Sequence, residues 1–263
     1  MYASASRGPP GIARAVDAYT NDAADTSIMY VTTSLPPTAE AAKELVRGIR
    51  AQRPGGGLET FVTGATADLM DTTEQMYSDF PKVIVYVLVA TYAALFMLFR
   101  SVLLPLKAVI LNVVSILASF GALVFVFQQG HFQSVLGFSS EGFTEATVPI
   151  LLFCIVFGLS MDYEVFLLSR VKEEYDAGAD NTAAVATGME RSGRVITSAA
   201  LVMVLVSAGF ATGDILIVKA LGFGTALAIL IDSTVVRALL APALMRVFGD
   251  ANWWTPGFLR PRP

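Results

Sequence analysis

The chain has 263 residues, of which 54% are hydrophobic and only 15% carry a charge, with a formal net charge of −4. Soluble domains carry about 25% charged residues, so this composition argues against an ordinary soluble protein. No phosphate-binding loop, nucleotide-binding fingerprint or nucleic-acid motif occurs, and the single cysteine, Cys154, excludes an intrachain disulfide.

Residues 1–80 are predicted to form a small α+β segment of β-α-β order. Residues 27–35 (SIMYVTTSL) are rich in strand-forming residues, and LETFVT (58–63) is expected to be a second strand. A helix is expected between them because apolar side chains recur at i, i+3, i+4 and i+7: Ala42, Leu45, Val46 and Ile49. Residues 66–80 are expected to be helical. Two strands and one helix bury too little surface to form a stable domain. We therefore expect this segment to be part of a larger α+β layer that other sequence completes.

Residues 81–247 are predicted to form a bundle of membrane-spanning helices. A helix needs about 20 apolar residues to cross a bilayer core. Stretches of nearly that length or more, almost free of charge, occur at 83–99, 108–127, 148–168, 195–212 and 220–244. We therefore expect a polytopic α-helical membrane protein with these spans, followed by a tail at 248–263.

The positively charged residues predict the orientation of the spans. Lys and Arg gather in the loops after the first, third and fifth spans, and the loop 128–146 contains neither. By the positive-inside rule residues 1–80 are expected outside the cell membrane and the tail in the cytoplasm. No apolar leader precedes the outer segment, so we expect this chain to be the C-terminal part of a longer protein or a truncated gene product, lacking at least one preceding span. The inner loop 170–194 is expected to be a short helix on the membrane surface or a solvated connector.

Three stretches together resemble a known family. They are GLSMDYEVFLLSRVKEEY from Gly158, RSGRVITSAALVMV from Arg191 and ALGFGTALAILIDSTVVRALLAPALMRVFG from Ala220. The chain is similar to the second half of MMPL exporters, which belong to the resistance, nodulation and cell division (RND) superfamily. A full member has twelve spans in two pseudo-repeated halves, each with an extracytoplasmic porter domain. The resemblance implies that this chain holds the end of the second porter domain and the last five spans of an RND-type bundle.

The resemblance also implies a function, namely proton-driven export of a lipid or another amphiphile. In the family an Asp-Tyr pair in the middle span of each half relays protons, and Asp162 and Tyr163 match this pair. Phe166 matches the aromatic residue one turn further along. No cofactor is implied beyond the proton as coupling ion. The implied partners are the missing N-terminal half, another RND-type subunit or a second copy of this chain.

The cost of placing a charged side chain in a membrane also favours a functional role for Asp162. A charged Asp at the centre of a span costs about 2.5 to 3.5 kcal/mol on insertion scales, so such residues usually have a function. At about 1.5 Å per residue Asp162 lies roughly 6 Å inward of the middle of its span, with Gly158 one turn before it. A proton-binding role is expected; the alternative is that Asp162 and Tyr163 merely hold helices together.

The other intramembrane polar residues admit more than one role. Glu164 lies about 200° around the helix from Asp162, at a depth similar to that of Arg237, so we hypothesise an interhelical ion pair. Asp232 is either a second protonation site or a hydrogen-bond acceptor. Thr197 and Ser198 are candidates for bonding a central carboxylate or for helix packing.

Two other classes of function remain as alternatives. Asp162 and Asp232 are two carboxylates in separate spans, as in an intramembrane aspartyl protease, but Met161 and Ile231 precede them where that class has a glycine. A non-transporting regulatory or assembly subunit on the same fold is the second alternative. His131, the only histidine, lies in the outer loop without further candidate metal ligands, so neither a metal site nor an enzyme is expected.

Overall fold

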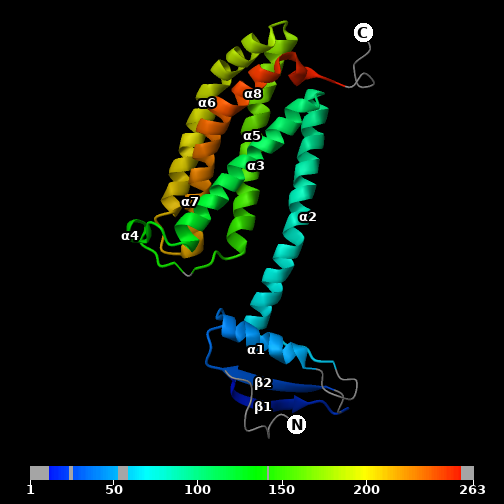
Figure 1. The fold of residues 1–263 in the computed structure, drawn as a ribbon, viewed down its shortest axis with the longest axis vertical. Helices are drawn as coiled ribbons and strands as arrows, with labels where there is room; N and C mark the ends of the chain where they lie inside the picture. The colour runs from blue at the N-terminus through cyan, green and yellow to red at the C-terminus, as the bar shows by residue number, and fades with distance from the viewer. Residues whose placement is uncertain (1–11, 24–25, 53–58, 141, 256–263) are drawn as a thin grey trace. The chain divides into compact units, whose positions relative to one another are not determined.

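The structure, a computed structural model, describes residues 12–23, 26–52, 59–140 and 142–255. Its contacts divide the chain into two units, Met1–Asp79 and Phe80–Pro263. The first unit contains a small sheet, and the second is a bundle of helices (Figure 1).

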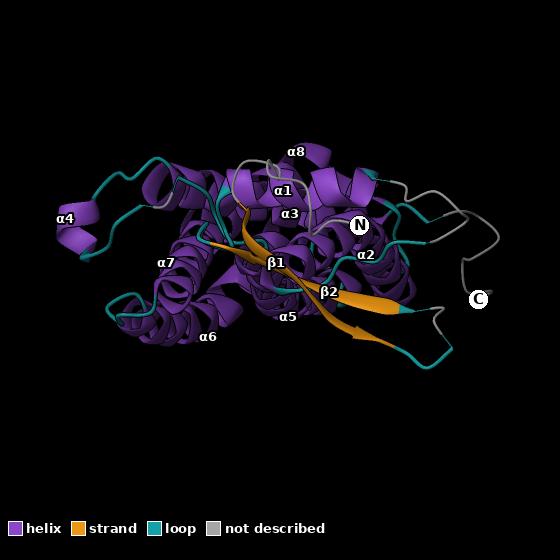
Figure 2. Cartoon of the chain, turned by 90° about the horizontal axis from the view of Figure 1, so that it is seen from below, coloured by secondary structure: helices purple, strands orange, loops and turns teal. Residues whose placement is uncertain are grey.

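The first unit has the order β-β-α in its described part, which corrects the β-α-β expectation. Strand β1 (Ile12–Thr20) pairs antiparallel with β2 (Ser27–Thr33), and helix α1 (Glu40–Ala51) follows (Figure 2). Residues 59–63 form no strand, and the side chain of Phe61 is 87% exposed. The strand expectation failed there because β2 takes its partner from the preceding segment, where the hairpin needs only a short connection.

Helix α1 buries the face that the sequence predicted, with Ala42, Leu45 and Val46 inward. Arg50 at its end donates to both carboxylate oxygens of Asp71, at 2.6 and 2.7 Å, and to the carbonyl of Val62 at 3.1 Å. This bidentate pair fixes α1 to the beginning of helix α2 (Ala65–Phe99). Helix α2 joins the predicted helix 66–80 and the first predicted span into one element of 35 residues that contains Pro81.

The second unit continues with four further long helical segments. Helix α3 (Leu103–Leu123) ends in a π-helix, η1 (Val124–Gln128), and the short α4 (Gln133–Leu136) lies in the following loop. Helices α5 (Thr147–Asp176) and α6 (Asn181–Phe210) come next. Helix α7 (Leu216–Ile231) runs through a π-helix, η2 (Asp232–Leu240), into α8 (Ala241–Phe248), and a 3₁₀ helix, η3 (Gly249–Trp253), ends the described chain.

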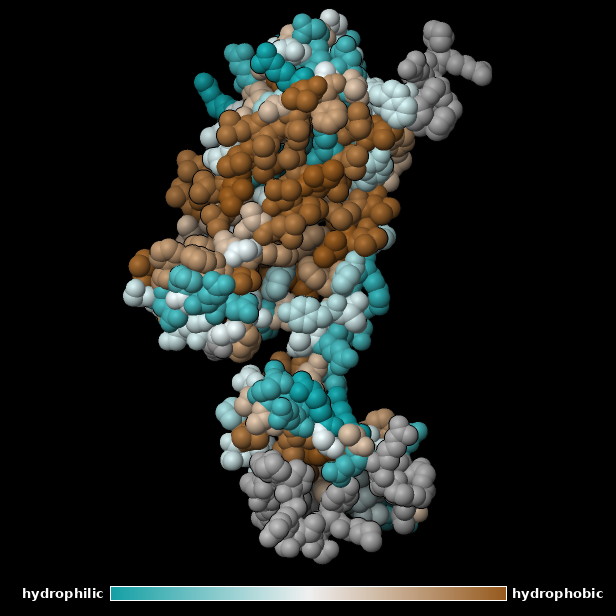
Figure 3. Space-filling view, viewed as in Figure 1, coloured by the Kyte–Doolittle hydropathy of each residue, from teal (hydrophilic) through white to brown (hydrophobic). Residues whose placement is uncertain are grey.

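Five of these helical segments are long and apolar enough to cross a membrane, and each corresponds to one of the predicted spans, although the fourth ends at Phe210, two residues before the predicted end at 212. The surface of the bundle is correspondingly apolar over much of the face in Figure 3. In water such a surface would be unfavourable, whereas lipid solvates it. The predicted fold class, a polytopic α-helical membrane protein with a small α+β segment before the bundle, is confirmed.

The loop 170–194 differs from both expectations for it. Helix α5 continues to Asp176 and α6 begins at Asn181, so only residues 177–180 connect them. Gly178 supplies the turn with a φ of 100°, and the Asp180 carboxylate caps α6 by accepting from the Ala183 amide at 2.8 Å. The charged residues of this stretch are good helix formers and pair along the helix, so they extend it instead of interrupting it.

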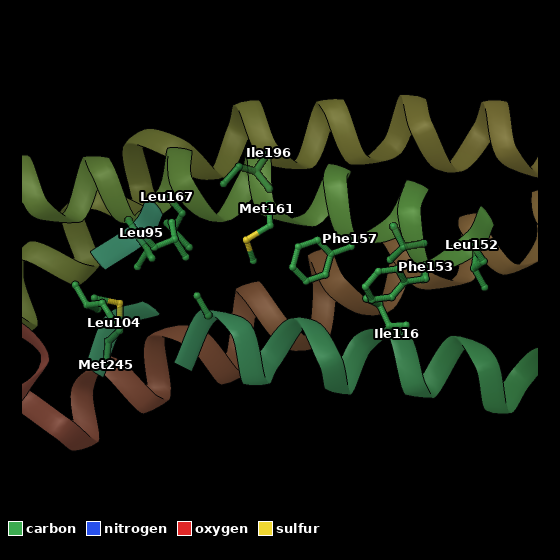
Figure 4. Close-up of a cluster of buried hydrophobic side chains, with 14 of the residues drawn as sticks. Leu95, Leu104, Ile116, Leu152, Phe153, Phe157, Met161, Leu167, Ile196 and Met245 are labelled. Carbon is green, nitrogen blue, oxygen red and sulfur yellow. The ribbon is translucent and has the colours of Figure 1, made fainter. Parts of the chain in front are cut away.

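Helix α5 packs against α3, α6 and α7. A side chain at Gly188 of α6 would meet Val171 of α5, with its Cβ at 2.6 Å from Cγ2, so this glycine permits close approach of the two helices. In Figure 4 Phe153, Phe157 and Met161 of α5 point into the buried apolar cluster. The residues around the middle of α5 are thus held by neighbouring helices on one side, and that packing defines which of them face outward.

Candidate functional site

Asp162 lies on the outside of the helix bundle. Its side chain is exposed, while those of the neighbouring Met161 and Glu164 are buried. Among the residues that the structure describes, no side chain forms an ion pair or a hydrogen bond with its carboxylate. Asp162 is therefore an ionisable group on the outer surface of the bundle, without a partner in the described chain.

The face that carries Asp162 is otherwise apolar. Leu151, Ile155 and Gly158 are exposed and precede Asp162 at helical spacings of four, three and four residues, so the four positions form one stripe along α5. No neighbouring atom lies within 4 Å of a Cβ built at Gly158. In a bilayer this stripe would leave a carboxylate against lipid unless another helix covers it.

A cluster of charged residues lies inside the bundle, on the other side of α5. The Nε of Arg237 donates to Asp232 Oδ2 at 2.7 Å, and its Nη1 lies 3.6 Å from Glu164 Oε2. Ser160 Oγ donates to Asp232 Oδ2 at 3.1 Å, and Arg237 Nη2 donates to the Ser160 carbonyl. All of these side chains are at most 5% exposed. The structure thus brings Glu164 and Arg237 together, as hypothesised, and adds Asp232 and Ser160.

The π-helix η2 explains how Asp232 reaches Arg237. The two residues are five positions apart. On an α-helix residues five apart point about 140° away from each other, whereas a π-helix has hydrogen bonds between i and i+5 and places such residues one turn apart. The wider turn of η2 directs both side chains toward α5, where Ser160 and Glu164 lie.

The cluster contains more negative than positive charge. Two carboxylates, Glu164 and Asp232, face one guanidinium group. Asp232 has two hydrogen bonds, whereas Glu164 has none within the described residues, and Arg237 Nη1 also lacks a hydrogen-bond partner there. Asp232 is therefore the tightly bound carboxylate, and Glu164 is the loosely bound one.

Tyr163 connects the exposed carboxylate to the buried cluster. The guanidinium carbon of Arg237 lies 5.5 Å from the centre of the Tyr163 ring, within cation–π range. Tyr163 is half-buried and directly follows Asp162 in the chain. Its ring thus packs on the buried charges, next to the residue that faces outward.

The remaining candidates lie apart from this cluster. Thr197 and Ser198 are exposed on α6, and Ser198 donates to the Val195 carbonyl at 3.0 Å, so neither bonds a carboxylate in the described chain. Phe166 is half-buried, with Arg170 at 5.5 Å from its ring centre. His131 stacks on Phe125, and no group of potential metal ligands occurs among the described residues.

Three buried polar residues of the bundle were not identified from the sequence, one in the cluster and two on α3. Ser160 resembles any small helix-packing residue until its place beside Asp232 is known. Asn112 of α3 is 3% exposed and its Nδ2 has no partner in the described structure. It lies one turn from Ser115, whose hydroxyl contacts the Ala228 carbonyl one turn before Asp232. The one available signal was an asparagine in the middle of an apolar span.

The fold and the site define a polytopic membrane protein with ionisable groups inside its helix bundle and on its outer face. The particular family follows from comparison with known proteins. The model of the MMPL family matches residues 13–263, so the chain belongs to the MMPL family, as the sequence motifs predicted.

Three relatives illustrate the range of functions. The chain is 40% identical to the "Mycolic acid-containing lipids exporter MmpL11" of Mycolicibacterium smegmatis, over 91% of this chain and 25% of that protein. It is 36% identical to the "Trehalose monomycolate exporter MmpL3" of Mycobacterium tuberculosis, over 90% and 25%. It is 39% identical to the "Heme uptake protein MmpL11" of the same species, over 89% and 24%. The chain thus spans about a quarter of the length of these relatives, which are named as transport proteins and not as enzymes.

Proposed function

We propose that this chain is part of an exporter of lipids or other amphiphilic compounds that is driven by the proton-motive force. Asp162 and Tyr163 form its proton relay. The observation that supports the relay most directly is the exposed, unpartnered Asp162 on an otherwise apolar face of α5. The names of two relatives, both lipid exporters, support the substrate class.

The cost of a charged carboxylate in lipid gives the relay its physical basis. Ionised Asp162 is unfavourable by about 2.5 to 3.5 kcal/mol unless water or a polar partner solvates it, whereas the neutral form tolerates an apolar contact. Protonation therefore favours closure of a second helical bundle over the stripe of Asp162, and deprotonation favours a hydrated arrangement. The partner that covers the stripe is the other half of the transporter, another RND-type subunit or a second copy.

The buried cluster supports the relay without moving protons in every cycle. Arg237 holds Asp232 and the ring of Tyr163, so it orients the tyrosine next to Asp162. Glu164, whose Oε2 lies 3.6 Å from Arg237 Nη1, completes the cluster as its second carboxylate. The pairing of Arg237 with Asp232 is structural.

The protease alternative has less support. Asp232 Oδ2 accepts hydrogen bonds from Ser160 and Arg237, and both carboxylates of a protease would have to share one water molecule instead. Asp232 is 3% exposed, whereas Asp162 faces outward. The regulatory-subunit alternative differs from transport in one measurable respect, since it requires no proton flux.

Proton flux in proteoliposomes tests the proposal. The chain is joined to a complementary half and reconstituted with a pH-sensitive dye inside, and an inward proton gradient is imposed. We expect proton entry that requires an amphiphile such as trehalose monomycolate. A parallel sample with heme distinguishes the two substrates that the relatives suggest. Absence of substrate-dependent proton entry with either compound would favour the regulatory alternative.

We further propose that the protein lies in the plasma membrane with residues 1–80 outside and the C-terminus in the cytoplasm. The distribution of Lys and Arg supports this orientation. Single cysteines at Ser140 and Ala179, in a variant without Cys154, test it in intact cells. An impermeant thiol reagent should label the cysteine at 140 and not the one at 179, and the reverse pattern contradicts the orientation.

A further inference from the structure

The last described segment, Gly249–Thr255, lies against one end of the helix bundle (Figure 1). Its central residue, Asn252, is 0% exposed although it is polar and lies near the end of the last candidate span. A buried asparagine is favourable only when its donors and acceptors are bonded. The hydrogen bonds and ring contacts of this segment therefore indicate which helices it joins.

Asn252 connects three helices through its polar atoms. Its Nδ2 donates to the carbonyls of Met245 and Gly249, each at 2.6 Å, and approaches Asn181 Oδ1 at 3.2 Å. Its Oδ1 accepts from Lys107 Nζ, and its backbone carbonyl accepts from Ser101 Oγ. One side chain thereby joins the beginning of α3, the beginning of α6 and the end of α8.

The residues that follow Asn252 reach the other helices. Trp253 stacks on Tyr175 of α5, with ring centres 4.3 Å apart and an interplanar angle of 14°, and its Nε1 donates to Asn181 Oδ1 at 3.0 Å. The Trp254 carbonyl accepts from the Val102 amide at 3.3 Å. Thr255 Oγ1 donates to the carbonyl of Arg100, the residue that follows α2. The segment thus contacts α3, α5 and α6 and the residue that follows α2, all at one end of the bundle.

The segment is held mainly by hydrogen bonds to residues far away in the sequence, and Trp253 packs against the large apolar cluster, which is formed mostly by the long helices. A short segment at the end of a bundle that is held mainly by hydrogen bonds opens more easily than the apolar core. We propose that Gly249–Thr255 is a latch that closes this end of the bundle, with Asn252 as its central residue. Displacement of the latch would release the ends of α3, α5 and α6 together. The latch does not depend on transport, so it can be tested separately from the proposed function.

Thiol accessibility in the purified chain tests the latch. Cys154, which is exposed, is replaced by serine, and Ala184 is replaced by cysteine as a reporter. Ala184 is 0% exposed and lies one turn after Asn181. Asn252→Ala should increase the rate at which this cysteine reacts with a maleimide by about tenfold or more, because several hydrogen bonds of the latch are lost together. The matched control is Trp254→Ala, which should leave the rate unchanged because that side chain is 52% exposed and has no hydrogen bond or ring contact in the described chain.

A second reporter separates local opening from unfolding. Ala228 of α7 is 0% exposed in the middle of the bundle, so Ala228→Cys should remain unreactive in the Asn252→Ala variant. Two results would overturn the latch. One is an unchanged rate at position 184 in Asn252→Ala. The other is an equal increase at positions 184 and 228, which would make Asn252 an ordinary determinant of folding.

Discussion

Replacing Arg237 with methionine should strongly destabilise the helix bundle. The substitution keeps the length of the apolar stem but removes the guanidinium group that lies between Asp232, at 2.7 Å, and Glu164, at 3.6 Å. It also removes the hydrogen bond to the Ser160 carbonyl and the contact with the Tyr163 ring. Leaving a buried charge without its partner costs about 3 to 5 kcal/mol, so we expect a loss of that size in the free energy of unfolding.

Unfolding of the purified chain by SDS in mixed micelles measures this loss. Arg246→Met is the matched control, since Arg246 is exposed on α8, and it should change stability by less than about 0.5 kcal/mol. Adding Asp232→Asn and Glu164→Gln to Arg237→Met should recover most of the loss, because the neutral amides need no counter-ion. If Arg237→Met costs no more than Arg246→Met, the buried cluster does not stabilise the bundle.

Two further predictions concern local contacts. Gly188→Ala should destabilise the bundle by about 1 to 3 kcal/mol, because the added Cβ would lie 2.9 Å from the Val171 Cα. Gly193→Ala is the control and should leave stability unchanged, because no atom lies within 4 Å of a Cβ at that position. SDS unfolding of both variants measures the difference. In the first unit, hydrogen bonding to Arg47 holds the pKa of Glu40 below its ordinary value, so the stabilisation from this pair is complete at neutral pH and is lost as the pH falls through that lowered pKa. Arg47→Gln should raise the Glu40 titration midpoint in a ¹³C NMR experiment, and an unchanged midpoint would contradict the pairing.

The spans could be predicted from the sequence because each is a long apolar run, and lipid imposes helices on such runs. The separation of Asp162 from Glu164 was also predictable, since residues two apart cannot share one face of a helix. The structure places Asp162 outward and Glu164 inward, as that geometry requires. These successes depend only on the length of apolar runs and on helical periodicity.

The failures arose where tertiary contacts or irregular geometry decide the structure. The π-helix at Asp232–Leu240 has no visible signature in the sequence, so the direct pairing of Asp232 with Arg237 was missed. The hairpin partner of Ser27–Thr33 was assigned to the wrong side, because strand propensity does not specify which strands pair. The burial of Asn252 depends on neighbours from distant parts of the chain, and no local pattern predicts it.

Proton-coupled flux through an Asp162→Asn variant tests the central claim most directly. In a transporter that contains this chain and its complementary half, asparagine keeps the shape and hydrogen bonding of the carboxyl group but cannot release a proton. Glu173→Gln is the matched control, because Glu173 is an exposed carboxylate near the end of the same helix. We predict that Asp162→Asn reaches the membrane at normal abundance and shows no proton-coupled export, while Glu173→Gln transports normally. Normal proton-coupled export by Asp162→Asn at wild-type abundance would contradict the account.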